Sequence, residues 1–198
     1  MIKKAVFIFL IIVPIIALVA ISATKEKDVP SNPSKIENFS LPDVSGKKHS
    51  LSDYKDSKAI VVMFIATECP VSNAYNKRMA KLYNKYKEKN IAFVGINSNK
   101  QESVNDIKNH SEKNELNFTI LKDDKNKIAD MFAASFTPEI YVLNPATYDI
   151  LYHGRIDDSR DESNVESPDL SNALDELLAG EKITVNTTKA FGCTIKRV

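Results

Sequence analysis

Cys69 is the residue best placed to do chemistry, because it stands at the junction of two predicted elements. Residues 59–65 form an apolar run with the length and β-branched content of a buried strand. After Pro70, which suits the first position of a helix, large apolar side chains recur at helical spacing to residue 86. Cys69 is therefore expected at the mouth of a helix, where unpaired N–H groups and the helix dipole favour the nucleophilic thiolate. The alternative is a buried, inert cysteine, which is more typical of a position within the strand.

Cys193, near the end of the chain, is the only other cysteine. In an oxidising compartment the two cysteines form either a structural disulfide that fixes the tail or a reversible redox pair. The tail of about 13 residues after Gly180 could span roughly 40 Å, so reach does not limit the pairing. We predict that the tail docks through Phe191 and Ile195 and brings Cys193 within bridging distance of Cys69. Pairing between two chains and a reduced Cys193 stay open as alternatives.

The three histidines are scattered and form no evident ligand set with Cys69. His49 lies in a predicted hairpin and His110 on a polar helix, where histidines are usually solvated, which leaves His153 as the only plausible ligand. A soft Cu(I) site needs more than a single thiolate. The sequence therefore predicts neither a bound metal nor another cofactor, and a copper-handling protein is kept only as a lesser alternative.

The elements around Cys69 alternate between strands and helices, which predicts an α/β sheet with helices on both faces. A short hairpin that turns at Gly46 precedes them. Pro138 opens a predicted core strand, which is unusual because proline removes a ladder donor. Asp123 and Asp124 are predicted to cap a short helix. Beyond residue 90 the expected strands are 91–96, 118–122, 138–143 and 149–158, and the expected helices are 102–113, 125–134 and 168–178.

Residues 1–23 have the layout of an export signal, in which Lys3 and Lys4 precede an apolar run at 5–22. The run is also close to the length of a membrane span, so a cleaved signal peptide and a retained anchor are both open. In either case the two lysines place the rest of the chain outside the cytoplasmic membrane, in the cell envelope or periplasm. We expect a linker at 24–36, one folded domain at 37–180 and a C-terminal tail at 181–198.

The charge balance excludes one class of partner. The whole chain has a net charge of +1, from 27 basic and 26 acidic residues, and residues 1–23 contribute two of the basic ones and none of the acidic ones. A near-neutral domain lacks the positive surface that binding to nucleic acid requires. We therefore predict no nucleic-acid partner, and contact with a membrane only through residues 5–22.

Several of these segments resemble a known family. The order strand, Cys-Pro-x-x, helix is similar to the active-site turn of the thioredoxin superfamily. The run Thr67-Glu-Cys-Pro-Val-Ser-Asn-Ala-Tyr75 resembles exported redoxin-domain proteins near the alkyl hydroperoxide reductase/thiol-specific antioxidant group. The resemblance extends from about Phe39 to the Gly-Cys-x-Ile ending at Ile195. It implies a thioredoxin-like fold with a mixed central sheet, an N-terminal hairpin, and a cis proline at 138 that faces Cys69.

The resemblance also implies a thiol-based oxidoreductase in which Cys69 is the nucleophile and Cys193 the candidate resolving thiol. Ser72 stands where a dithiol oxidoreductase has its second cysteine. Its hydroxyl could donate a hydrogen bond to the thiolate, but it cannot resolve a mixed disulfide. The implied substrates are a thiol or disulfide protein partner or a small peroxide. A tethered, non-catalytic interaction domain of the same fold is the alternative.

Peroxide reduction is the less favoured of these reactions. Peroxiredoxins have a proline and a hydroxyl residue at the positions of Val62 and Ala66, which here are aliphatic. Thr67 is one residue out of register with that hydroxyl, so a rearranged pocket stays open. The arginine that polarises peroxide is also missing from its usual place before Pro138, and Arg155 is the nearest alternative cation.

Overall fold

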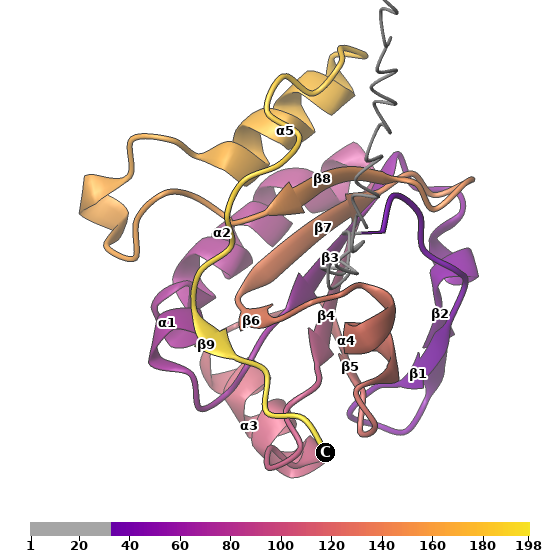
Figure 1. Cartoon of the computed structure of the whole chain (residues 1–198), viewed down its shortest axis with the longest axis vertical. Coiled ribbons are helices and arrows are strands. Elements are labelled where there is room, and N and C mark those ends of the chain that lie inside the picture. The colour runs from indigo at the N-terminus through magenta and orange to yellow at the C-terminus, as the bar shows by residue number, and fades with distance from the viewer. Residues whose placement is uncertain (1–32) are drawn as a thin grey trace, which may run out of the picture.

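The computed structural model describes residues 33–198 (Figure 1). The predicted export segment at 1–23 and most of the predicted linker at 24–36 lie outside this part of the chain. The chain is already packed at Ile36, which is buried and donates its N–H to the carbonyl oxygen of Tyr148 at 3.0 Å. Within residues 33–198, no helix is both long enough and apolar enough to span a membrane.

A five-stranded mixed sheet forms the centre of the fold (Figure 1). Its strands are β3 (Ala59–Phe64), β4 (Ile91–Asn97), β5 (Thr119–Lys122), β7 (Glu139–Leu143) and β8 (Ile150–Gly154), in the spatial order β5-β4-β3-β7-β8. The central strand β3 runs parallel to β4 and antiparallel to β7, and β5 and β8 extend the sheet on either side. All residues of β3 are buried, because both faces of the sheet are covered, and this explains its unbroken apolar run.

Helices cover both faces of this sheet. They are α1 (Pro70–Ala74), α2 (Asn76–Tyr86), α3 (Val104–Lys113), α4 (Lys127–Met131) and α5 (Asp169–Leu178), with short 3₁₀ turns at Leu51–Tyr54, Lys87–Lys89 and Glu162–Asn164. On one face, Met79 of α2 and Leu174 of α5 share a core cluster with Val61 of β3. On the other face, Phe132 packs edge-to-face on Phe64, with ring centroids 5.3 Å apart.

Two small sheets complete the fold. The hairpin of β1 (Ser40–Pro42) and β2 (Lys48–Ser50) turns at Gly46, whose φ of 86° favours glycine. The second sheet pairs β6 (Phe136–Thr137) with β9 (Cys193–Thr194). The expected α/β class, mixed sheet, helices on both faces and N-terminal hairpin are therefore confirmed.

The bounds of two predicted helices were wrong in detail. The helix after Pro70 is interrupted at Tyr75, whose N–H bonds to the carbonyl of Ser72 three residues earlier. The helix expected from residue 102 begins at Val104, because the Ser103 side chain caps it. Glu102 consequently lies before the helix, and it is buried.

The predicted cap of α4 is half correct. Asp123 accepts hydrogen bonds from the N–H groups of Ile128 at 3.1 Å and Ala129 at 3.0 Å. Asp124 was expected to share this role, but it is exposed and instead lies 3.9 Å from Lys122. The residue at the N-cap position is Asn126, in the left-handed conformation with φ 56°.

Candidate functional site

Cys69 lies at the N-terminal end of α1, after the loop that follows β3. It is the N-cap residue of that helix and is 5% exposed. Its Sγ accepts a hydrogen bond from the backbone N–H of Ser72 at 3.3 Å, the kind of donor that stabilises a thiolate. The Ser72 hydroxyl accepts a hydrogen bond from the N–H of Ala66 at 3.2 Å. The group of Ser72 that contacts the sulfur is therefore the backbone amide.

Cys69 forms a disulfide with Cys193, which follows it by 124 residues, and their Cα atoms are 5.9 Å apart. The tail reaches this position as β9, which runs antiparallel to β6 and places Cys193 opposite Thr137 (Figure 1). The next residue but one, Ile195, donates its N–H to the carbonyl of Ser135 at 3.0 Å. The prediction that the tail docks with Cys193 beside Cys69 is confirmed.

Thr137 and Pro138 join β6 to β7, and the peptide bond between them is cis. The carbonyl oxygen of Thr137 lies 3.3 Å from Cys69 Sγ. The side-chain hydroxyl of Thr137 donates a hydrogen bond to the carbonyl oxygen of Cys193 at 3.5 Å. The cis isomer expected at Pro138 is thus confirmed, and the residue before it contacts Cys69. A chemical role for Pro138 stays a prediction.

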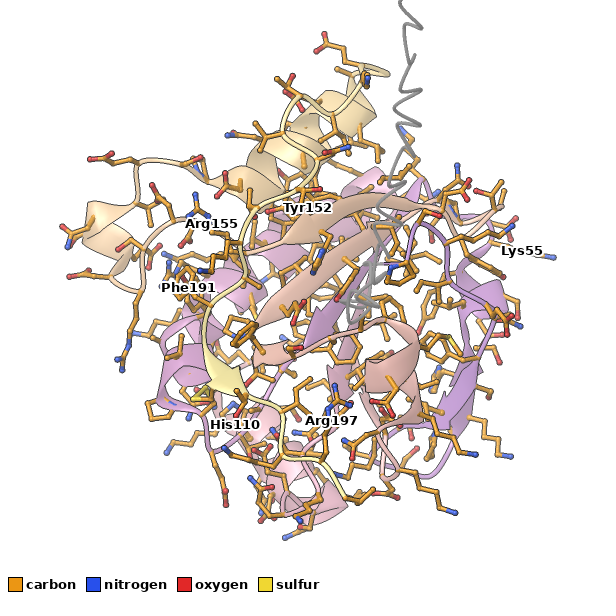
Figure 2. All side chains as sticks on the ribbon, in the orientation of Figure 1. Lys55, His110, Tyr152, Arg155, Phe191 and Arg197 are labelled. Atoms are coloured by element: carbon orange, nitrogen blue, oxygen red, sulfur yellow. A yellow bond between two sulfur atoms is a disulfide. The ribbon has the colours of Figure 1, made fainter. Side chains whose placement is uncertain are left out.

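Two other predicted site residues, Thr67 and Arg155, form hydrogen bonds with carboxylates rather than with Cys69. Thr67 donates its N–H to Glu102 at 2.7 Å, and its hydroxyl is buried with no hydrogen-bond partner within residues 33–198. Arg155, labelled in Figure 2, donates from Nε to Asp169 of α5 at 2.7 Å. A hollow of about 170 Å³ opens beside the disulfide, and the cation among its lining residues is Lys196 rather than Arg155.

The tail approaches the disulfide along the edge strand β8. His153 donates its N–H to the carbonyl of Asn186 at 3.0 Å, and Thr188 donates to the carbonyl of His153 at 2.9 Å. Phe191, labelled in Figure 2, then packs edge-to-face on Tyr75, with ring centroids 6.2 Å apart. The apolar anchors predicted for the tail are confirmed, since Phe191 packs on Tyr75 and Ile195 is buried.

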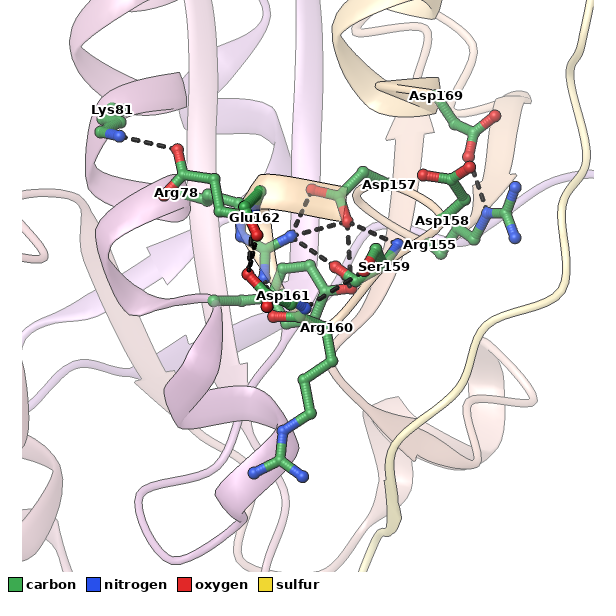
Figure 3. A network of polar contacts seen from close by, with 12 residues as sticks. Arg78, Lys81, Arg155, Asp157, Asp158, Ser159, Arg160, Asp161, Glu162 and Asp169 are labelled. Atoms are coloured by element: carbon green, nitrogen blue, oxygen red, sulfur yellow. Dashed lines mark hydrogen bonds and ion pairs between the residues drawn. The ribbon is translucent and has the colours of Figure 1, made fainter. Parts of the chain in front are cut away.

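A buried ion pair fixes the segment after β8 against α2 (Figure 3). Arg78 Nη1 lies 2.6 Å from Asp157 Oδ2, and Arg78 Nη2 donates to the carbonyl of Arg160 at 2.6 Å. Tyr75 donates its hydroxyl to Asp157 at 3.1 Å, and burial together with that carboxylate raises the pKa of Tyr75. Arg160 Nη2 donates in turn to the carbonyl of Pro70 at 3.4 Å, so this segment borders the turn that carries Cys69.

Sequence reasoning missed the buried polar loop at residues 97–102. Glu102 is 2% exposed and accepts hydrogen bonds from the N–H groups of Thr67 and Glu68, directly before Cys69. In the sequence, Glu102 appears at the start of a polar surface helix. A signal was present only in the Ser103 to Asp106 capping box, which places the helix start after Glu102.

The histidines have other partners, and the described residues hold no evident metal site. His49 lies 2.9 Å from Asp43, His110 lies 3.0 Å from Asn76, and His153 lies 2.7 Å from Glu139. Within residues 33–198, no three side chains of His, Cys, Asp or Glu are grouped so that they could hold a metal ion.

The site combines a cysteine at the strand-to-helix turn of a mixed sheet, a second cysteine bonded to it, and a cis proline nearby. This combination defines a thioredoxin-like domain with a redox-active cysteine pair. The chain belongs to the AhpC/TSA family, whose model matches residues 33–159. It is 26% identical over 148 residues to the thiol-disulfide oxidoreductase ResA of Bacillus cereus, which covers 72% of this chain and 84% of that relative. The oxidoreductase class expected from the sequence is confirmed.

Solved structures agree with this fold. A conserved protein of Geobacillus kaustophilus is 30% identical and superposes with a TM-score of 0.78, over 84% of this chain and 93% of that one. The thioredoxin domain of a Bacteroides vulgatus thiol-disulfide oxidoreductase superposes with a TM-score of 0.53 at 20% identity, over 61% of this chain and 85% of that one. The expected thioredoxin-like fold is therefore confirmed.

Proposed function

We propose that this chain is an exported thiol-disulfide oxidoreductase in which Cys69 is the nucleophile and Cys193 the resolving thiol. The observation that carries the proposal is the Cys69–Cys193 disulfide, which joins the strand-to-helix turn to a docked tail. The proposed substrate is a disulfide or a dithiol, carried by a protein or a small molecule, and the name of the thiol-disulfide oxidoreductase relative supports this reaction class.

The proposed reaction is a half-reaction between the cysteine pair and one substrate disulfide, and a second dithiol substrate completes the cycle by the reverse steps. In the reduced enzyme, the Cys69 thiolate attacks one sulfur of the substrate disulfide, and one substrate thiolate leaves. The Cys193 thiolate then attacks Cys69 Sγ in the mixed disulfide, and the second substrate thiolate leaves. Two electrons pass from the cysteine pair to the substrate, and the two protons of the thiols end on its sulfurs. The Cys69–Cys193 disulfide is the product, and the reverse sequence oxidises a substrate dithiol.

Thiol-disulfide exchange is favoured over peroxide reduction by the surroundings of Cys69. Val62 and Ala66 are buried aliphatic residues at the positions expected to shape a peroxide pocket. Arg155 pairs through Nε with Asp169, and it is not among the residues that line the hollow beside Cys69.

Export is proposed from the N-terminal sequence. Residues 1–23 combine a basic head with an apolar run, and they precede the folded domain. We propose that the domain acts outside the cytoplasmic membrane, either released by cleavage or held by residues 5–22. A reporter that is active only in the cytoplasm, fused to the C-terminus, tests this: activity of the fusion would refute export.

The catalytic proposal is tested by turnover. The purified protein is supplied with dithiothreitol and either oxidised glutathione or hydrogen peroxide, beside the Cys69→Ser and Cys193→Ser variants. We expect the wild type to accelerate reduction of oxidised glutathione, and Cys69→Ser to match buffer alone. Acceleration that survives Cys69→Ser, or none with either substrate, would reject the proposal in favour of the non-catalytic interaction domain. Acceleration with peroxide alone would replace exchange by peroxidase activity.

A further inference from the structure

The loop at residues 97–102, which begins at the last residue of β4, is polar in sequence and yet largely buried. Asn97, Ser98, Asn99 and Glu102 are each 1–3% exposed. Buried polar groups are costly unless they are hydrogen-bonded, so such a loop persists only if its bonds are satisfied. Its partners lie on both segments that carry the cysteines.

Glu102 binds the segment that leads to Cys69. Its Oε2 accepts from the N–H of Thr67 at 2.7 Å and from Asn97 Nδ2 at 2.5 Å. Its Oε1 accepts from the N–H of Glu68 at 3.3 Å and from Asn99 Nδ2 at 3.0 Å. The carboxylate thus holds two consecutive backbone amides immediately before the nucleophile.

Asn99 binds the segment that follows Cys193. Its Oδ1 accepts from the N–H of Lys196 at 2.8 Å, while its Nδ2 donates to Glu102. The neighbouring Lys100 donates its N–H to the carbonyl of Lys196 at 2.9 Å. Both backbone groups of Lys196, three residues after Cys193, are therefore held by this loop.

We propose that Glu102 and Asn99 are positioning residues that hold Cys69 and Cys193 close enough to form their disulfide. A continuous set of hydrogen bonds leads from the amides before Cys69, through Glu102 and Asn99, to the tail amide after Cys193. None of these bonds involves a sulfur atom, so reduction of the disulfide does not itself remove any of them. They keep the Cys193 thiol close to Cys69, which raises its effective concentration and favours closure of the disulfide over release of the tail.

This inference rests on the proposed function, and the redox equilibrium of the Cys69–Cys193 pair tests it. The full chain is equilibrated with graded ratios of reduced and oxidised dithiothreitol, and the oxidised fraction is read by thiol labelling and mass spectrometry. Asn99→Asp keeps the acceptor for Lys196 but sets two carboxylates against each other at Glu102. We expect its disulfide equilibrium constant to fall about tenfold, which corresponds to a potential about 30 mV less negative.

Glu102→Gln should act in the same direction, because both carboxylate oxygens accept hydrogen bonds and the glutamine amide keeps only one acceptor oxygen. In either orientation its NH2 group faces two donors, one of them a backbone amide before Cys69. The double variant Asn99→Asp with Glu102→Gln reverses the polarity of the Asn99–Glu102 bond and keeps the charge, and it loses only the longer bond from the N–H of Glu68 at 3.3 Å. We therefore expect recovery to within about threefold of the wild type. Lys196→Pro deletes the N–H that donates a hydrogen bond to Asn99 Oδ1, and Lys196 is exposed and outside the buried loop. It should lower the equilibrium constant even if the buried variants fold poorly.

Ser98→Ala is the matched control. Ser98 is buried in the same loop but donates to Asp123 at 2.9 Å, away from both cysteines. It should lower the free energy of unfolding without moving the redox equilibrium. The inference is overturned if Lys196→Pro and the single variants leave the equilibrium constant unchanged, or if Ser98→Ala shifts it equally. A wild type that forms no Cys69–Cys193 bond at any ratio would instead reject the proposed function.

Discussion

Gly192 lies so close to the carbonyl oxygen of Thr137 that a Cβ atom at this position would overlap with it. The same carbonyl oxygen is 3.3 Å from Cys69 Sγ, and Thr137 is the register partner of Cys193. The glycine before Cys193 therefore allows the tail to approach the backbone beside the cis proline, and this approach brings the two sulfurs together.

Gly192→Ala should push β9 away from β6, because the new methyl group meets backbone rather than a flexible side chain. We expect the Cys69–Cys193 disulfide to become easier to reduce, by about tenfold or more in the equilibrium with dithiothreitol. Gly46→Ala is the control, since its φ is also positive but no atom lies within 4 Å of the added Cβ. Equal redox equilibria for the two variants would contradict this account.

Ser72→Ala should separate stability from reactivity. The variant leaves the buried N–H of Ala66 without its acceptor, which costs about 1–3 kcal/mol in the free energy of unfolding. The backbone N–H of Ser72, which contacts Cys69 Sγ, is retained. The alkylation rate of Cys69 in the reduced protein at pH 7 should thus stay within about twofold of the wild type. A drop of tenfold would show that the hydroxyl, rather than the amide, stabilises the thiolate.

Two ion pairs between α2 and the segment after β8 should differ greatly in their contribution to stability (Figure 3). Arg78 and Asp157 are buried, whereas Lys81 and Glu162 are more than half exposed. Asp157→Ala leaves a buried guanidinium unpaired and should lower the free energy of unfolding by about 3–5 kcal/mol. Glu162→Ala should lower it by less than about 1 kcal/mol. Denaturant unfolding of both variants measures the difference, and similar losses would be inconsistent with it.

Glu139 should give the fold an acid-sensitive contribution beside the site. Burial alone would raise the pKa of Glu139, but hydrogen bonds from His153, from the amides of Ser135 and Phe136, and from Tyr141 lower it below its ordinary value. Its stabilisation is therefore full above the ordinary glutamate pKa of about 4.3 and is lost as the pH falls through the lower folded-state pKa.

Glu139→Gln is the variant that measures this contribution. It should lower the free energy of unfolding by about 1–3 kcal/mol at pH 7, and the difference from the wild type should shrink below pH ~4.3. A difference that stays constant down to pH ~2 would show that Glu139 does not bind its proton more weakly in the folded state.

The strand-to-helix turn at Cys69 could be predicted because its signals are local. They are the apolar run of β3, the proline after Cys69 and the helical spacing that follows, and all three lie close together in the sequence. The docking of the tail could also be predicted, since Phe191 and Ile195 flank Cys193 in an otherwise polar segment.

The buried polar contacts could not be predicted, because each depends on partners distant in sequence. Glu102 is buried through amides 34 and 35 residues earlier, and Arg78 through a carboxylate 79 residues later. Arg155 was a candidate because it is the nearest alternative to the arginine that is missing before Pro138. The sequence did not reveal that Asp169, at the start of α5, binds its guanidinium.

The most direct test of the central claim is to find which cysteine a disulfide substrate meets first. Reduced wild type, Cys193→Ser and Cys69→Ser proteins are mixed with oxidised glutathione, quenched with acid at increasing times, and mapped by mass spectrometry. We predict that Cys193→Ser accumulates glutathione on Cys69, whereas the wild type carries it only transiently and ends as the Cys69–Cys193 disulfide with two glutathiones released. Glutathione that appears first on Cys193, or that persists on Cys69 in the wild type, would contradict the assigned roles.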